Sequence, residues 1–290
     1  MSTVYDVAVV GSGGFLGGAI TRELGARGHQ VATFTRQDPL VVGGQWAARA
    51  AHVNAVVWAA GAISPVVAHE RPDLVDAELA AFAAFVDAAA ALPVVPRIVL
   101  LSSGGAIYGR PGFPAYRETD DPHPANAYGA FKLEQERILA GAHETTTAVR
   151  IANAYGPGQR GARGQGVLAI WMRAILAGRP ITILGTGEVE RDYVYVGDAV
   201  DAIARVVERA DAPPVLNVGS GHPTHLNDLL DLVEYVVGHE RVRVERLPAR
   251  GVDPDSTWLD VSLARESLAW MPSTPLADGI ARMWAWAQSA

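Results

Sequence analysis

The stretch VAVVGSGGFLG, from Val7 to Gly17, decides the fold of this chain. It opens with a short apolar run, Val7 to Val10, and leads into residues that favour a helix. Gly11, Gly14 and Gly17 have a GxxGxxG spacing, which brings a strand-to-helix turn and a helix N-terminus to the pyrophosphate of a dinucleotide. A glycine-rich turn without a ligand is the alternative, but the position directly after the first strand favours a cofactor site.

The composition is that of a folded globular protein. Of the 290 residues, 49% are hydrophobic and 19% are charged, a balance that argues against long disordered segments. This length favours one large α/β unit, alone or with a smaller lobe. The formal net charge of -7 favours neither nucleic acid nor an anionic membrane as a partner.

Several chemistries have no support in the sequence. The chain has no cysteine, which excludes disulfides, thiolate catalysis and cysteine-ligated metal. The eight histidines form no HExxH or similar pair, so we expect no metal site. The start, MSTVYDVAVV, lacks a cationic region before an apolar stretch, and no apolar run reaches membrane-spanning length. We therefore expect a cytoplasmic protein.

Strand-like apolar runs alternate with amphipathic helical stretches in the first half of the chain. The predicted elements are, in order, Val7 to Val10, Gly17 to Arg27, Val31 to Phe34, Ala55 to Ala59, Leu74 to Ala91, Arg97 to Leu101 and Ala127 to Ala140. This alternation predicts an α/β fold with a doubly wound parallel sheet. The alanine-rich helix over Leu74 to Ala91 either lies buried on the sheet or forms a dimer interface with the helix that carries Tyr128.

The second half is more mixed. The predicted elements are a strand over Thr147 to Ile151, a glycine-rich loop, a helix over Val167 to Ala177, a strand over Ile181 to Leu184 and a helix over Ala199 to Arg209. From about Asn217 the chain combines short elements with tryptophans. We expect a nucleotide-binding domain from residues 1–152 and about 193–216, and a substrate lobe from about 153–192 and 217–290.

Tyr128 and Lys132, in the segment YGAFK, stand four residues apart and therefore on one face of a helix. An ammonium beside a phenol, together with an oxidised nicotinamide ring, favours the phenolate and lowers the tyrosine pKa. Tyr128 is thus a candidate proton donor or acceptor at a carbinol oxygen, and Lys132 is a candidate for lowering the pKa of Tyr128.

The end of the second strand indicates which dinucleotide binds. NAD-binding chains normally carry a carboxylate there for the ribose hydroxyls, whereas this chain reads VATFTRQ. Thr35 and Arg36 offer a hydroxyl and a guanidinium to a 2′-phosphate, which favours NADP, with NAD possible. The alternative is that Arg36 is a solvated surface residue and the ribose binds in another way.

A series of motifs, in order along nearly the whole chain, resembles a known family. The motifs are GSGGFLG, VVWAAG (Val56 to Gly61), LSSGGAIYG (Leu101 to Gly109), YGAFK, RIANAYGPG (Arg150 to Gly158), RDYVYVGD (Arg191 to Asp198) and ARGVD (Ala249 to Asp253). Together they resemble the extended short-chain dehydrogenases/reductases, in the group of nucleotide-sugar epimerases, dehydratases and ketoreductases. The resemblance implies a Rossmann domain, a smaller C-terminal α/β lobe, an NAD(P)-dependent oxidoreductase and a homodimer.

The resemblance also assigns candidate site residues. The implied cofactor contacts are Gly11, Gly14, Phe15, Leu16, Gly17, Thr35, Arg36, Ala59, Ala60, Gly61, Tyr128 and Lys132. The implied contacts to the diphosphate and nucleoside of a dTDP- or UDP-type sugar are Asn153, Arg191, Arg250 and Asp253. Guanidinium groups suit a diphosphate, since an acidic protein needs local cations to bind an anion.

Departures from the family pattern narrow the expected chemistry. The family's polarising Ser or Thr falls at Gly104, which has no hydroxyl, so Ser103 is the remaining candidate, with a loop-stabilising role as its alternative. The dehydratases carry an Asp-Glu pair where this chain has Gly105 and Ala106, so we do not expect dehydration. Glu78 stands near a position usually held by asparagine, and the short connection before VVWAAG has no obvious aspartate for the adenine, so these two departures leave the adenine contacts open.

Three functions follow. The first is an NADPH-dependent reductase of a nucleotide-linked 4-keto deoxysugar, with Tyr128 as proton donor, Lys132 on the nicotinamide ribose and Ser103 on the carbonyl. The second is an NAD-dependent nucleotide-sugar 4-epimerase that uses the same residues in both directions. The third is a catalytically silent dinucleotide sensor or scaffold, against which the retained Tyr128 and Lys132 count.

Overall fold

The computed structural model describes residues 3–109, 115–142, 145–161, 166–248 and 256–290. Its centre is a six-stranded parallel sheet in the order β12-β7-β6-β5-β1-β2. Those strands are β1 (Asp6–Val10), β2 (Gln30–Phe34), β5 (Ala55–Trp58), β6 (Arg97–Ser103), β7 (Thr146–Ile151) and β12 (Val215–Val218). The predicted doubly wound α/β fold is confirmed.

The strands of the sheet consist of apolar runs because helices cover both faces of the sheet. In β1, Val7 and Val9 belong to one hydrophobic core, while Ala8 and Val10 belong to the other. Side chains alternate along a strand, so a continuous apolar run is what a sheet covered on both sides requires.

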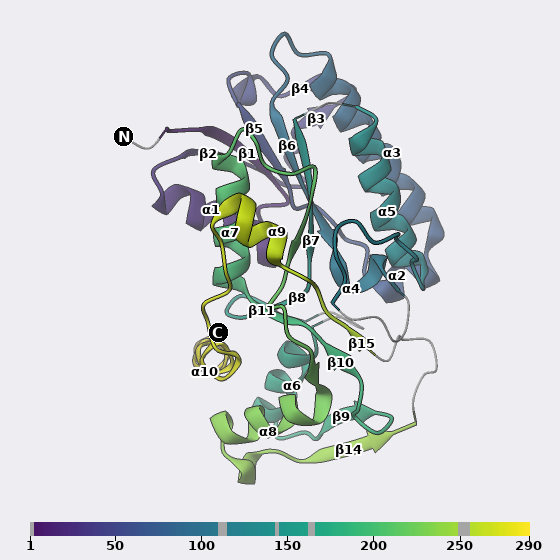
Figure 1. Cartoon of the computed structure of the whole chain (residues 1–290), viewed down its shortest axis with the longest axis vertical. Coiled ribbons are helices and arrows are strands. Elements are labelled where there is room, and N and C mark those ends of the chain that lie inside the picture. Colours follow the sequence, from purple (N-terminus) through teal and green to yellow (C-terminus); the bar gives the residue numbers. More distant parts are fainter. Residues whose placement is uncertain (1–2, 110–114, 143–144, 162–165, 249–255) are drawn as a thin grey trace.

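Helices cover the two faces of the sheet (Figure 1). One face carries α1 (Phe15–Ala26), α7 (Val196–Glu208) and α9 (Ser262–Leu268). The other carries α3 (Pro72–Ala90) and α5 (Ala127–Ala140), with α2 (Pro65–Glu70) beside them. Short elements near this layer are β3 (Val41–Val42), β4 (Gln45–Trp46), η1 (Ala48–Ala50) and α4 (Gly104–Ile107).

The helix α3 lies on the sheet, as one reading of its alanine content predicts. Phe82 and Phe85 are buried against the sheet, whereas Ala77, Ala81 and Ala84 are exposed on the other side of the helix. The expected homodimer stays a prediction.

A smaller lobe has its own core, in the lower half of Figure 1. Its helices are α6 (Val167–Leu176), α8 (Leu226–Val237), η2 (His239–Arg241) and α10 (Leu276–Ser289). Its strands form the parallel pair β9 (Ile181–Leu184) and β14 (Val244–Leu247) and the set β10 (Glu190–Arg191), β13 (Thr224–His225) and β15 (Ser256–Thr257). The pair β8 (Asn153–Tyr155) and β11 (Tyr193–Tyr195) lies between the lobe and the sheet.

The helix α9 differs from the expected division of the chain. The sequence-based boundaries gave its residues to the lobe, but Ala264 and Leu268 are buried in the same core as α1 and α7. Trp270, which follows α9, is also buried there, and its indole donates a hydrogen bond to the Asp198 carbonyl at 3.0 Å. The chain therefore returns to the Rossmann core after leaving the lobe.

Within the described parts of the chain, we find no helix with both the length and the apolarity needed to cross a membrane.

Candidate active site

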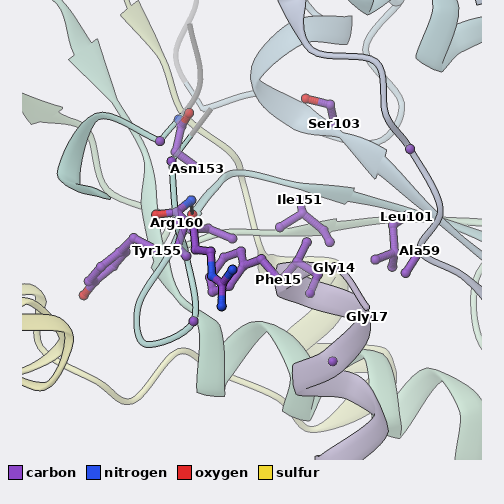
Figure 2. Close-up of a pocket in the computed structure, with 18 of the residues that line it drawn as sticks. Gly14, Phe15, Gly17, Ala59, Leu101, Ser103, Ile151, Asn153, Tyr155 and Arg160 are labelled. Atoms are coloured by element: carbon purple, nitrogen blue, oxygen red, sulfur yellow. Dashed lines mark hydrogen bonds between the residues drawn. The ribbon is translucent and has the colours of Figure 1, made fainter. Parts of the chain in front are cut away.

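A cavity of about 1050 Å³ lies where the strands β1, β5, β6 and β7 end. In open parallel sheets, ligands bind in the crevice outside these carboxyl ends. Figure 2 shows Gly14, Phe15 and Gly17 at the start of α1 on one side of the cavity, with Ser103 and Asn153 away from them. Tyr128 and Lys132 line the same cavity.

The glycine loop is shaped by close backbone contacts. A Cβ on Gly11, whose φ is +88°, would come within 2.6 Å of the Ala60 backbone nitrogen and 2.7 Å of the Ala59 carbonyl oxygen. A Cβ on Gly17 would overlap the Gly11 carbonyl. Only glycine lets this turn approach the end of β5, and the first backbone N–H groups of α1 then border the cavity.

Most of the predicted cofactor contacts do line the cavity. They are Gly14, Phe15, Leu16, Gly17, Ala59, Ala60, Gly61, Tyr128 and Lys132. Gly11 is not a lining residue; it lies against the backbone of Ala59 and Ala60. A dinucleotide fits this surface, because the glycine cradle and the N-terminus of α1 offer hydrogen-bond donors to a pyrophosphate.

The helix α5 sets the position of Tyr128 and Lys132. Its N-cap is Asn126, whose side chain accepts a hydrogen bond from the Gly129 N–H at 2.9 Å. Tyr128 follows in the first turn, at the positive end of the helix dipole. A Cβ at position 129 would overlap the Ala106 carbonyl. The glycine there therefore allows α5 to pack closely against α4.

Lys132 is buried and held by neutral groups. Its Nζ donates hydrogen bonds to the Leu101 carbonyl at 3.2 Å and to Gln135 Oε1 at 3.0 Å. Burial lowers the pKa of Lys132 from 10.5 to about 8, although the nearby carboxylates of Glu78 and Glu136 act to raise it. The ammonium thus loses its proton far more readily than an exposed lysine does.

Ser103 and Gly104 mark the end of β6 and the start of α4. Ser103 is half-buried and lines the cavity, and its side chain makes no capping hydrogen bond to α4. At Gly104, a Cβ would lie 2.6 Å from Leu259 Cδ1 and 2.8 Å from Cδ2. The position of the missing hydroxyl is therefore occupied by a buried leucine from the C-terminal part of the chain.

Beneath the site lies a buried polar network that the sequence reasoning did not find. Arg150 donates to Glu136 Oε2 at 2.7 Å and to the Tyr108 hydroxyl at 2.8 Å, and Ser102 donates to Glu136 Oε1 at 2.6 Å. Burial raises the pKa of Tyr108 to about 12. Burial acts to lower the pKa of Arg150, but the hydrogen bonds and charge interactions with Glu136 and Tyr108 together raise it above its ordinary value. Since Glu136 is one turn beyond Lys132, the network also fixes α5 against β6 and β7.

The predicted NADP contacts, Thr35 and Arg36, follow β2 and lie outside the set that lines the cavity. Arg36 is exposed, and its guanidinium has no ion-pair or hydrogen-bond partner among the described residues. Asp38, two residues later, is bound by both Arg49 nitrogens, at 2.8 and 2.6 Å. Arg49 also lies 4.1 Å from the centroid of the Phe34 ring.

The cavity has further cationic and aromatic residues that the sequence reasoning missed. They are Arg22, Tyr155, Arg160, Tyr193 and Trp286. The i, i+4 spacing of Gly14, Gly18 and Arg22 could have revealed Arg22, since these positions share one face of α1. No comparable local pattern points to Trp286, which comes from the last helix.

The predicted substrate contacts are only partly brought together. Asn153 lines the cavity, and its Nδ2 donates to the Asp192 carbonyl at 3.0 Å. Arg191 is half-buried on β10, donates to the Glu190 carbonyl at 2.7 Å and is not a lining residue. Arg250 and Asp253 lie outside the described residues.

Glu78, on α3, accepts a hydrogen bond from the Ala62 N–H at 3.0 Å through its Oε1, in the loop beside Lys132.

A parallel Rossmann sheet, a glycine cradle at a helix N-terminus and a Tyr-Lys pair on one cavity wall define a dinucleotide-binding protein of the short-chain dehydrogenase/reductase type. The model of the "NAD dependent epimerase/dehydratase family" matches residues 7–219, and the chain belongs to that family. The predicted membership in the nucleotide-sugar group of extended short-chain dehydrogenases/reductases is confirmed, and so is the expectation of an enzyme family.

Curated relatives include both epimerases and reductases. The chain is 38% identical over 200 residues to a UDP-glucose 4-epimerase of Mycolicibacterium smegmatis. This match covers 67% of this chain and 63% of the relative. The chain is 32% identical over 191 residues to a dTDP-4-dehydro-6-deoxyglucose reductase of Escherichia coli, covering 64% and 60%. A dTDP-6-deoxy-L-talose 4-dehydrogenase (NAD(P)(+)) of Kitasatospora kifunensis is 28% identical over 308 residues, covering 96% and 94%. The first two matches thus span under two thirds of those relatives' lengths.

Solved structures agree over nearly the whole chain. A UDP-glucose 4-epimerase of Thermotoga maritima with UDP-glucose has a TM-score of 0.86 at 26% identity and covers 98% of this chain and 99% of that one. A UDP-glucose 4-epimerase of Thermus thermophilus in complex with NAD has a TM-score of 0.85 at 27% identity, with the same coverage.

Proposed function

We propose that the protein is an NADPH-dependent reductase of a nucleotide-linked 4-keto deoxysugar, of the dTDP or UDP type. The observation that carries the proposal is that Tyr128 and Lys132 share the cavity wall with the glycine cradle. The similarity to a dTDP-4-dehydro-6-deoxyglucose reductase and to a dTDP-6-deoxy-L-talose 4-dehydrogenase supports this substrate class.

The residues of the cavity divide the work of a carbonyl reduction. A bound NADPH supplies the hydride. Tyr128 delivers a proton to the nascent alkoxide oxygen, and Lys132 holds the nicotinamide ribose and favours the tyrosinate that remains. We assign the hydrogen bond to the carbonyl oxygen to Ser103. Gly104 has no hydroxyl to make this bond, and Leu259 packs against the place where its side chain would be.

The charges after β2 support NADP over NAD. The Asp38 carboxylate, which could otherwise repel a 2′-phosphate, is paired with Arg49. Arg36 therefore leaves a net positive charge at the end of the strand, and a guanidinium binds phosphate oxygens well. A reductase also exchanges its spent cofactor, and the NADPH pool suits net reduction.

A cofactor titration tests the proposal. NADPH and NADH are compared in binding and in turnover of a dTDP-4-keto-6-deoxysugar, for the wild type, Arg36→Ala and the control Arg265→Ala, which removes an exposed arginine on α9. We expect the wild type to prefer NADPH and Arg36→Ala to lose about tenfold of that preference, equal to about 1.4 kcal/mol. An unchanged preference in Arg36→Ala would refute the cofactor assignment.

The second candidate is a nucleotide-sugar 4-epimerase, which the similarity to UDP-glucose 4-epimerases favours. In that reaction Tyr128 first accepts and later returns the proton, and the cofactor is regenerated within each turnover. Protein that copurifies with NAD(H), epimerises a UDP-hexose and consumes no added NADPH would replace the reductase with the epimerase. A silent sensor, in contrast, would keep its function when Tyr128 is changed to Phe.

A further inference from the structure

We propose that Glu78 is a positioning residue that keeps the Lys132 ammonium charged and ties the β5–α2 loop over it. The inference rests on the proposed function only in so far as Lys132 is assigned there to the cofactor ribose and to Tyr128.

The loop between β5 and α2 connects the two residues. Glu78, on α3, accepts the Ala62 N–H at 3.0 Å through its Oε1. One residue earlier, a Cβ on Gly61 would stand 3.9 Å from Lys132 Nζ. The loop is therefore held by the Glu78 carboxylate on one side and lies in contact range of the ammonium on the other.

Glu78 is the carboxylate that can balance the charge of Lys132, because the other groups near Nζ are neutral or already paired. Both hydrogen-bond acceptors of Nζ, the Leu101 carbonyl and the Gln135 amide, are neutral. The carboxylate of Glu136, on the same helix, is already bound to the buried Arg150 and to Ser102.

Among the described residues, the carboxylates that act on the Lys132 charge are Glu78 and Glu136, and Glu136 is already paired with Arg150. Glu134 and Arg137, also on α5, pair with each other at the surface, and α2, which packs on α5, carries His69 and Glu70. Glu78, on α3, accepts the Ala62 N–H and forms no salt bridge with the residues that the structure describes.

The electrostatic direction agrees with this geometry. Burial is the largest influence on Lys132 and lowers its pKa, and Glu78 is the first of the two carboxylates that raise it again. Without the Glu78 charge, the ammonium would release its proton at a lower pH, and the ribose contact would then fail at a lower pH.

The experiment measures NADPH binding against pH by cofactor fluorescence. All variants carry Tyr128→Phe, which removes the titration of that phenol. Glu78→Gln keeps an oxygen for the Ala62 N–H but removes the charge, Glu78→Asp keeps the charge, and Asp87→Asn removes an exposed carboxylate further along α3 as a matched control. If the protein binds NADH instead, the same titration is run with NADH.

We expect Glu78→Gln to move the alkaline loss of binding to lower pH by about half a unit or more, a change of about threefold in proton affinity. Asp87→Asn should leave the curve in place, and Glu78→Asp should restore at least part of the shift. A curve for Glu78→Gln that coincides with its parent overturns the proposal. So does an equal shift in Asp87→Asn.

A second comparison separates the charge of Lys132 from a direct contact between Glu78 and the cofactor. In a Lys132→Met background there is no ammonium to protect, so Glu78→Gln should change the affinity by less than about twofold. A loss as large as in the presence of Lys132 overturns the proposal. Because these measurements need no sugar substrate, their outcome is independent of whether the reductase or the epimerase assignment fails.

Discussion

The contact between Gly104 and Leu259 makes a prediction whose sign opposes the usual rule. Gly104 is the first residue of α4, and an alanine in a helix is normally more stable than glycine by up to about 1 kcal/mol. Here the added Cβ would stand 2.6 Å from Leu259 Cδ1, well inside contact distance. We therefore expect Gly104→Ala to destabilise the protein.

The magnitude follows from the packing of Leu259. This side chain is 1% exposed and belongs to a cluster with Tyr108 and Tyr116, whose rings stack 4.7 Å apart. It has little room to withdraw, so Gly104→Ala should cost about 1 to 3 kcal/mol, the range found for overpacked cores. Leu259→Ala alone should cost about 2 to 5 kcal/mol through the cavity that it leaves.

A double-mutant cycle measured by urea denaturation tests the contact. Leu259→Ala removes the atoms that obstruct position 104, so the double variant should be more stable than the sum of the single effects by at least about 1 kcal/mol. The control is Gly25→Ala, in α1, where nothing lies within 4 Å of the added Cβ and a gain of about 0.5 to 1 kcal/mol is expected. If Gly104→Ala stabilises the protein as Gly25→Ala does, the steric argument is refuted.

Three further predictions concern α5. Glu136→Gln should lower the free energy of unfolding by about 3 kcal/mol, because it leaves the buried Arg150 charge without its partner; a urea denaturation curve that changes by under about 1 kcal/mol would contradict this. Asn126→Ala, which removes the N-cap acceptor of the Gly129 N–H, should cost about 1 kcal/mol in the same assay, and no loss would mean that the cap is idle. The stability should rise from about pH 8 toward 10.5, because the unfolded chain still holds a proton that the folded Lys132 has released. Lys132→Met should remove this rise, and a rise that persists in that variant would assign it to another group.

The sequence predicts the fold well where the signal is local. The apolar runs gave β9 and α5 with their observed ends, since a strand or helix that packs on a core shows its period in a few residues. The start of α1 is less accurate, because Phe15 follows the glycine turn directly and the helix begins there and not at Gly17. The glycine cradle and the Tyr-Lys pair were also readable, because each is defined by a short spacing along the chain.

The contacts that cross the chain were not readable in this way. Leu259 reaches Gly104, and Glu78 reaches the loop beside Lys132, only through the tertiary arrangement of separate elements. Arg191 shows the reverse case: its motif matches the family, yet the described structure places it on β10, away from the cavity lining. A motif identifies a segment, whereas the direction of its side chain depends on the neighbours that the fold supplies.

The leucine at position 259 bears on how the proposed reaction is catalysed. A missing hydroxyl could be replaced by an ordered water only if polar room remained at Gly104, but Leu259 fills that place with methyl groups. The donors that remain near the carbonyl in the proposed site are Ser103 and Tyr128, both on the cavity wall. Ser103→Ala should therefore reduce kcat by about tenfold or more if the serine polarises the carbonyl. An unchanged kcat would leave Tyr128 as both the proton donor and the hydrogen-bond donor to the substrate oxygen.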